Sequence, residues 1–140
     1  MIYFSNPKPG FTKNKNKILK DILNIIDSGQ YIKGKNCQIF EKTFQKYLKV
    51  KHVVGTGNAT DALYISIKAL NLKKGDEIIT TSLTATATGL SILNAGAKLK
   101  LIDICDKSYC LDLKLLERKI TKKTKAIIIV HLYGQSCNMN

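Results

Sequence analysis

The sequence predicts an α/β fold with a mostly parallel sheet flanked by helices. From residue 52 onward, short apolar runs alternate with amphipathic stretches of helical length. Ile78-Ile79 and Ala126–Val130 lack polar alternation, which is typical of parallel strands covered on both faces. The length of 140 residues and the 44% hydrophobic content are sufficient for a core in one domain of common size.

Two helices are expected before this alternating region. Four isoleucines recur at helical spacing between Asn14 and Ser28, after an extended start at Pro7–Gly10, and apolar residues recur again between Cys37 and Leu48. Four strands and three crossover helices then follow. The expected strands are His52–Thr56, Glu77–Thr80, Lys98–Ile104 and Lys125–Tyr133, and the expected helices are Thr60–Leu70, Thr84–Asn94 and Leu113–Ile120.

The formal net charge of +13 raises nucleic acid as a partner. However, Arg118 is the only arginine, and the lysines are scattered over every segment. Arginine is the residue that base readout and bidentate phosphate binding favour. We therefore expect a solvated lysine-rich surface and no specific nucleic-acid partner, and a basic nucleic-acid-binding α/β domain stays as an alternative.

No membrane or metal partner is expected from the sequence. The longest apolar run, Ala126–Val130, is too short to cross a bilayer, and the first residues lack a secretory pattern, so a soluble, cytoplasmic protein is predicted. The four cysteines form no pair of Cys-x-x-Cys motifs, so a zinc site has no support.

The loop Gly55–Thr60 is the first candidate site. It joins an expected strand to an expected helix, and small residues before a helix leave backbone amides open to an anion such as phosphate. Asn58 or Thr60 could cap that helix. A plain strand-to-helix turn with a good cap is the alternative, and these residues alone do not separate the two.

Two other phosphate-binding motifs do not match this loop. A nucleotide P-loop needs Gly-Lys followed by Ser or Thr, whereas the chain has Asn58-Ala-Thr60 there. A dinucleotide site needs a third glycine at Thr60 and an acidic residue at the end of the next strand, but Asp76-Glu77 precede that strand.

The order and spacing of ten short motifs resemble the DegT/StrS-type sugar-nucleotide aminotransferases, which use pyridoxal phosphate (PLP) and have the fold-type I architecture. The motifs are Asp27–Gly34, Phe40-Glu41, Val50–Val53, Gly57–Leu63, Gly75–Ile79, Thr84–Thr88, Ala95–Ala97, Asp103-Ile104, Thr124–Ile127 and His131–Gln135. The resemblance implies that residues 1–140 are an N-terminal segment plus the first half of the PLP-binding large domain. The rest of that domain and a C-terminal small domain would be absent.

The resemblance also implies site residues. Asn58, Ala59 and Thr60 match the loop that holds the PLP phosphate, and Ala85 falls where many relatives stack an aromatic ring on the pyridine. An alanine cannot stack, and this version of the segment is similar to relatives that act on 3-keto sugar nucleotides. Residues expected near the substrate are Phe4, Gln30, Tyr31, Ile32 and Lys33.

The expected reaction transfers an amino group, from L-glutamate, to a keto group of a nucleotide-linked deoxysugar, and the full-length enzyme is expected to be a homodimer. In relatives the Schiff-base lysine and the aspartate beside the pyridine nitrogen lie downstream of the motif His131–Gln135. No lysine of this chain occupies the matching position, so no catalytic residue is assigned, and the 140 residues alone are expected to be inactive. The alternative is an inactive truncated paralogue that binds a nucleotide sugar or a partner chain.

Overall fold

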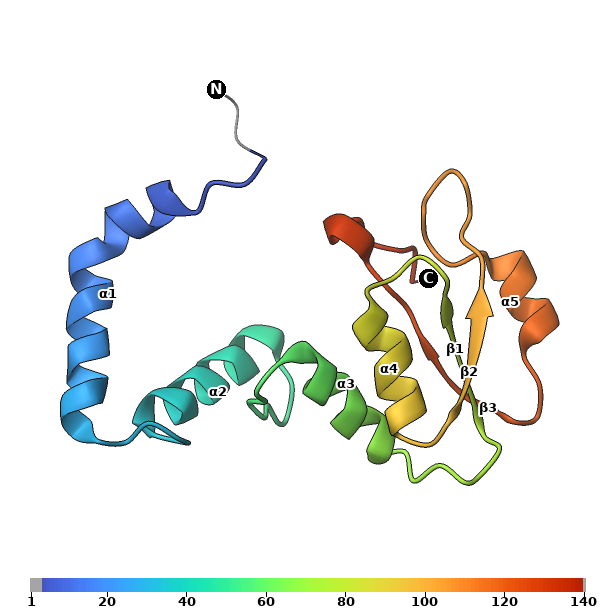
Figure 1. Ribbon diagram of the computed structural model, residues 1–140, viewed down its shortest axis with the longest axis horizontal. Helices are drawn as coiled ribbons and strands as arrows, with labels where there is room; N and C mark the ends of the chain where they lie inside the picture. The colour runs from blue at the N-terminus through green and yellow to red at the C-terminus, as the bar shows by residue number, and fades with distance from the viewer. Residues whose placement is uncertain (1–3, 140) are drawn as a thin grey trace. The chain divides into compact units, whose positions relative to one another are not determined.

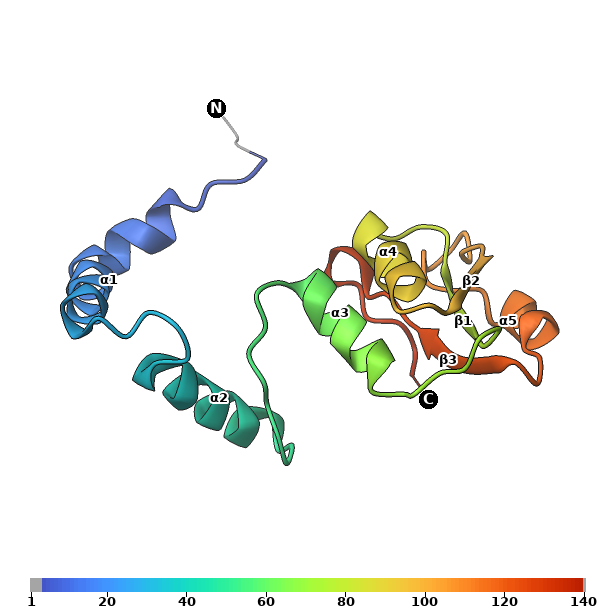
Figure 2. The same ribbon diagram turned by 60° about the horizontal axis from the view of Figure 1, so that its bottom comes forward.

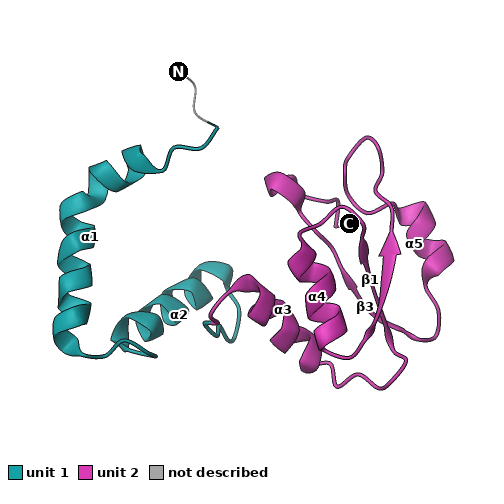
Figure 3. Cartoon of the chain, viewed as in Figure 1, with its two compact units in different colours: residues 1–55 teal, residues 56–140 magenta. Residues whose placement is uncertain are grey.

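A computed structural model describes residues 4–139 of the chain. The chain divides into two compact units, residues 1–55 and residues 56–140 (Figure 3). The first unit consists of two helices, and the second contains the parallel sheet. Within the described residues, no helix combines the length and the apolar character needed to cross a membrane.

Helix α1 (Lys8–Ser28) is longer than the sequence predicted. Its first turn contains Pro9 and Gly10, which were expected to be extended. Proline is tolerated in the first turn because the N–H groups there have no intrahelical acceptor, and its fixed φ suits a helix. The helix ends as predicted at Gly29, which has φ 66° and donates its N–H to the Ile26 carbonyl at 3.1 Å.

Helix α2 (Lys35–Leu48) confirms the second predicted helix. The rings of Phe40 and Phe44 stack with centroids 5.4 Å apart, and Phe44 and Tyr47 stack at 6.3 Å. These aromatic residues recur at helical spacing, so they share one face of α2. The helix ends at Lys49, whose left-handed backbone has φ 55°.

The second unit begins with helix α3 and then alternates strands and helices (Figure 1). Its elements are α3 (Ala59–Lys68), β1 (Glu77–Thr81), α4 (Thr86–Asn94), β2 (Lys98–Ile102), α5 (Leu113–Lys119), β3 (Thr124–Ile128) and the short 3-10 helix η1 (Leu132–Gly134). The three strands form one parallel sheet in the order β2-β1-β3. This confirms the predicted α/β class with a parallel sheet.

The side chains of two neighbouring isoleucines in β1 pack on opposite faces of the sheet. Ile78 packs in a cluster with Ile67 of α3 and Ile92 of α4. Ile79 packs in a second cluster with Ile102 and with Leu115 of α5. Helices α3 and α4 therefore cover one face, and α5 covers the other (Figures 1 and 2). Every residue of β1 is buried, as expected for a central strand with helices on both sides.

The predicted strand His52–Thr56 is wrong, because these residues form no strand in the structure. A strand needs a neighbour for its backbone hydrogen bonds, and no strand among residues 4–139 pairs with this segment. Val54 is 78% exposed, so its apolar character is not used in a core. The sequence of this segment is apolar, as a strand requires. Whether another strand lies beside it cannot be predicted from these residues alone.

Strand β3 is shorter than predicted and is not covered on both faces. It pairs with β1 up to Ile128, and the expected residues beyond it form a turn that contains η1. Ala126 and Ile128 pack against the cluster around Ile78, whereas Ile127 and Ile129 are exposed by about a third. The difference arises because β3 is an edge strand and α5 packs against β2.

Candidate functional site

The start of α3 is built around Asn58. Its backbone is extended, with φ −162° and ψ 173°, and its side chain caps the helix. The Asn58 Oδ1 accepts the N–H of Asp61 at 2.9 Å, and the Asn58 carbonyl accepts the N–H of Ala62 at 3.1 Å. Of the two caps that the sequence offered, the structure uses Asn58 and places Thr60 within the first turn.

This cap leaves two backbone donors open. Neither the N–H of Ala59 nor that of Thr60 donates to another group within residues 4–139. The first N–H groups of a helix have no intrahelical acceptor, and the helix dipole places partial positive charge there. Ala59 is exposed and Thr60 is half-buried, so an anion can approach these donors from solvent.

Asp61 places a negative charge beside the same donors. Its Oδ2 accepts a hydrogen bond from the Asn58 side-chain amide at 2.9 Å. A Cβ added at Gly57 would lie only 3.3 Å from that oxygen, so the carboxylate sits over Gly57. The carboxylate thus turns back onto the loop rather than outward, and it competes with any anion bound at the amides of Ala59 and Thr60.

Ala85 immediately precedes α4, and no side chain caps that helix. Its carbonyl accepts the N–H of Thr88 at 3.0 Å, and the hydroxyls of Thr84 and Thr88 lie 2.9 Å apart. Ala85 is exposed. A small residue at this position leaves the space above the first turn of α4 open.

Ser91 connects the two helix starts, and sequence reasoning did not identify it. Its fully buried hydroxyl donates to the Thr60 carbonyl at 3.1 Å and to the Ala87 carbonyl at 2.7 Å. The structure therefore joins the first turn of α3 to α4. The spacing of Thr84, Thr88 and Ser91 along one helix face was the available signal.

The residues expected near the substrate belong to the first unit. Gln30, Tyr31, Ile32 and Lys33 form the turn between α1 and α2, and all four are exposed. The Tyr31 hydroxyl donates to the Ile26 carbonyl at 3.1 Å, and Lys33 has a left-handed backbone with φ 51°. Hollows of about 340 and 580 Å³ flank this turn. Phe4 precedes α1 and is fully exposed.

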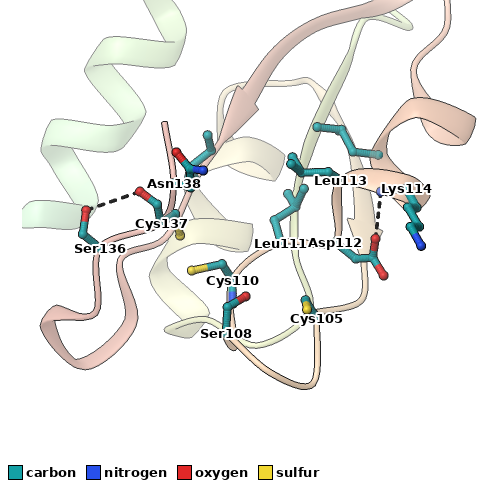
Figure 4. Close-up of a pocket in the computed structure, with 12 residues that line it drawn as sticks. Cys105, Ser108, Cys110, Leu111, Asp112, Leu113, Lys114, Ser136, Cys137 and Asn138 are labelled. Atoms are coloured by element: carbon teal, nitrogen blue, oxygen red, sulfur yellow. Dashed lines mark hydrogen bonds between the residues drawn. The ribbon is translucent and has the colours of Figure 1, made fainter. Parts of the chain in front are cut away.

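A further pocket of about 530 Å³ lies at the carboxyl ends of β2 and β3 (Figure 4). Its walls come from the loop after β2, the start of α5 and the segment after β3, and they include three cysteines. None of the predicted site residues lines it. No group of three His, Cys, Asp or Glu side chains within residues 4–139 is placed to hold a metal ion.

These features define a class of protein: a parallel α/β sheet with two open backbone N–H donors at a helix start on its carboxyl edge. That is the arrangement in which open α/β sheets bind phosphorylated ligands. The sequence model of the DegT/DnrJ/EryC1/StrS aminotransferase family matches residues 12–140. The chain belongs to this family, as its motifs predicted.

Individual relatives agree with this assignment. The chain is 37% identical, over 99% of its length, to dTDP-3-amino-3,6-dideoxy-alpha-D-galactopyranose transaminase of Aneurinibacillus thermoaerophilus. It is 39% identical, over its whole length, to UDP-2-acetamido-2-deoxy-3-oxo-D-glucuronate aminotransferase of Pseudomonas aeruginosa. The fold matches the crystal structure of S. venezuelae DesV in complex with a ketimine intermediate, with a TM-score of 0.93 and 31% identity over 99% of this chain.

The chain spans little more than a third of these relatives. It covers 38% of the Aneurinibacillus enzyme, 39% of the Pseudomonas enzyme and 37% of the DesV chain. The structural match confirms the fold-type I aminotransferase architecture over this part.

Proposed function

We propose that the chain holds the phosphate of PLP in a sugar-nucleotide aminotransferase. The single observation that carries the proposal is the pair of open N–H groups at Ala59 and Thr60, in a chain that belongs to an aminotransferase family. The whole protein would transfer an amino group, from L-glutamate, to a keto group of a nucleotide-linked deoxysugar.

The residues at the start of α3 fit a phosphate group, with the exception of the Asp61 carboxylate, which lies beside the donors. Two backbone donors and the hydroxyl of Thr60 lie within one helical turn, and Gly57 and Ala59 add no bulk around them. The side chain of Asn58 is engaged with Asp61, so its role is to shape the loop. When bound, PLP supplies an electron sink for amino-group transfer, and the protein supplies position and charge.

Ala85 would border the ring of the cofactor without stacking on it. The exposed turn Gln30–Lys33 and Phe4 would contact the nucleotide-linked substrate. Support for this substrate class comes from the two transaminases above, whose names specify nucleotide-linked sugars. A homodimer of the full-length enzyme forms part of the same proposal.

Removing one N–H donor without disturbing the helix tests the phosphate site. Proline is well tolerated at the first helical position, so Ala59→Pro deletes a donor at little cost to α3. The preceding residue, Asn58, is already extended, as proline requires. Loss of a hydrogen bond to a charged group predicts about tenfold weaker PLP binding in equilibrium dialysis.

The matched control is Leu113→Pro at the first position of α5, which follows the extended residue Asp112. This change also removes one N–H group, and PLP binding should be unaffected. Pyridoxal without its phosphate should bind equally weakly to wild type and to Ala59→Pro. Equal PLP affinities for wild type and Ala59→Pro would contradict the phosphate assignment.

The chain by itself should not form a covalent bond between PLP and one specific lysine. Treatment with PLP and borohydride, followed by peptide mapping, should label no single lysine of residues 1–140 selectively. A stoichiometric adduct at one lysine would show that this chain carries its own Schiff-base residue.

A binding role without catalysis is the second candidate. Among residues 4–139 no strand pairs with the outer edge of β3, and Ile127 and Ile129 are partly exposed there, which suits pairing with a further strand from a partner chain. Analytical ultracentrifugation of the chain alone and with a full-length relative distinguishes a partner-binding chain from a monomer.

A further inference from the structure

Three cysteines gather around the pocket at the carboxyl ends of β2 and β3. Cys105 and Cys110 lie in the loop that follows β2, and Cys137 lies in the segment that follows β3. Figure 4 shows the sulfur atoms of Cys110 and Cys137 in the same part of the pocket and that of Cys105 apart from them. Residues distant in sequence thus bring two thiols together.

Cys137 is held firmly in place. Its Sγ donates to the Val130 carbonyl at 3.3 Å, and its backbone N–H donates to Nδ1 of His131 at 3.1 Å. These bonds fold the segment back onto the end of β3, and only 8% of Cys137 is exposed. Its side chain lines the same pocket as that of Cys110, and the Cys110 thiol raises the pKa of Cys137.

Cys110 is fixed by its own loop. Its carbonyl accepts the N–H of Cys105 at 2.8 Å, and its N–H donates to the Ser108 hydroxyl at 3.3 Å. An antiparallel bridge between Ile104 and Leu111 closes the same loop. Cys110 is half-buried, so it is more accessible from solvent than Cys137.

We propose that Cys110 and Cys137 are a reversible redox pair that forms a disulfide across this pocket. Two thiols that face the same part of one pocket can reach the S–S bond length of about 2.05 Å by side-chain movement. The bond would join the loop after β2 to the segment after β3, at the edge of the sheet that carries the candidate cofactor site.

The oxidant is a hydroperoxide. In the first step, the more accessible Cys110 sulfur attacks the peroxide O–O bond, which gives Cys110 sulfenic acid and releases the alcohol, or water from hydrogen peroxide. In the second step, the Cys137 sulfur displaces hydroxide from that sulfenic acid, and the thiol proton leaves with the hydroxide as water. Two thiols lose two electrons and two protons, and a dithiol reductant reverses the change.

Cys105 is the competing thiol. Backbone N–H groups of Lys107 and Ser108 lower the pKa of Cys105, which favours its thiolate. By contrast, the Cys110 side chain and burial raise the pKa of Cys137. Cys105 therefore reacts readily with peroxide, but its sulfur lies apart from the other two in the pocket (Figure 4).

Peptide mapping separates these possibilities. Trypsin places the three thiols in different peptides, residues 101–107, 108–114 and 126–140. The chain is reduced, treated with hydrogen peroxide, blocked with N-ethylmaleimide, digested and analysed by mass spectrometry without reductant. The expected product links peptides 108–114 and 126–140 within one chain, and dithiothreitol separates them.

The Cys105→Ser variant should form this link undiminished, whereas Cys110→Ser should not form it. Oxidation of the unfolded chain in guanidinium chloride is a second control that does not depend on any variant folding. In a random chain, loop length favours a Cys105–Cys110 link over a Cys110–Cys137 link by about tenfold. The folded chain should reverse this preference.

A dominant Cys105–Cys110 link in the folded chain would overturn the proposal. Disulfide links that form only between chains would also overturn it. So would the finding that all three thiols still react with N-ethylmaleimide after peroxide treatment.

Discussion

The hydroxyl of Ser91 lies 3.1 Å from the carbonyl oxygen of Thr60 and donates a hydrogen bond to it. This bond connects α4 with the first turn of α3, where the N–H groups of Ala59 and Thr60 are open. Because Ser91 is fully buried, water cannot replace the bond. The position of the candidate phosphate site therefore depends on the packing of α3 against α4.

Ser91→Ala should destabilise the second unit. The Thr60 carbonyl would keep its helical N–H partner in α3 but lose the Ser91 donor, and the loss of one hydrogen bond costs about 0.5–1.5 kcal/mol. Urea unfolding followed by circular dichroism measures this change. The matched control is Ser66→Ala, because Ser66 makes a similar bond to the Ala62 carbonyl at 2.8 Å but is exposed, and its loss should cost at most about 0.5 kcal/mol. Equal effects of both variants would contradict the special role of Ser91.

Asp61→Asn should strengthen phosphate binding. The Asp61 carboxylate lies against Gly57 and Asn58, beside the open donors, and it repels an anion there. Removing a charge from the first turn of a helix changes the energy by about 0.3–1 kcal/mol, which corresponds to about a two- to fivefold gain in affinity. Isothermal titration with inorganic phosphate at low salt measures it. Asp76→Asn, a change outside the helix start, is the control, and a gain there of equal size would indicate a general charge effect.

Glu77 should make stability depend on pH. The hydrogen bond from Lys100, at 2.8 Å, is the main cause that lowers the pKa of Glu77, and Thr121 and the charges of both Lys100 and Lys98 lower it further. A pKa that is lower in the folded state stabilises the fold above the unfolded-state value. This stability is lost as pH falls through the folded-state pKa.

Glu77→Gln should therefore flatten the acid side of the stability profile, measured as the urea midpoint between neutral and acidic pH. The exposed residue Glu117 supplies the control, Glu117→Gln, which should leave the profile unchanged. An unchanged acid side for Glu77→Gln would show that the contact with Lys100 does not stabilise the fold.

Ile78→Ala and Ile79→Ala should both be strongly destabilising. Both side chains are fully buried, on opposite faces of β1, so each truncation leaves a cavity in a different cluster. Such changes cost about 2–5 kcal/mol. Because the clusters are separate, the two effects should add in the double variant, as measured by denaturant unfolding. Ile65→Ala, at a residue that is 53% exposed, should cost much less.

The candidate site was predicted in part. The turn at Asn58–Thr60 was located from its small residues and its place before a helix, and the structure shows the cap and the open donors that this pattern implies. Ser91 was missed, because its contact with Thr60 joins residues 31 positions apart. The position of Cys110 and Cys137 in one pocket was missed for the same reason.

The amino-acid sequence by itself determined the family and the approximate places of the helices and the three paired strands, because these depend on local periodicity, turn residues and short motifs. It missed the first turn of α1 and the end of β3. Tertiary structure alone decided that His52–Thr56 has no strand partner among residues 4–139, that β3 is an edge strand there, that Ser91 reaches Thr60, and that Cys110 and Cys137 line one pocket. The physical reason is that strand pairing and buried hydrogen bonds need a second group from elsewhere in the chain. A local pattern shows which groups can bond, and only the fold determines which partner each one reaches.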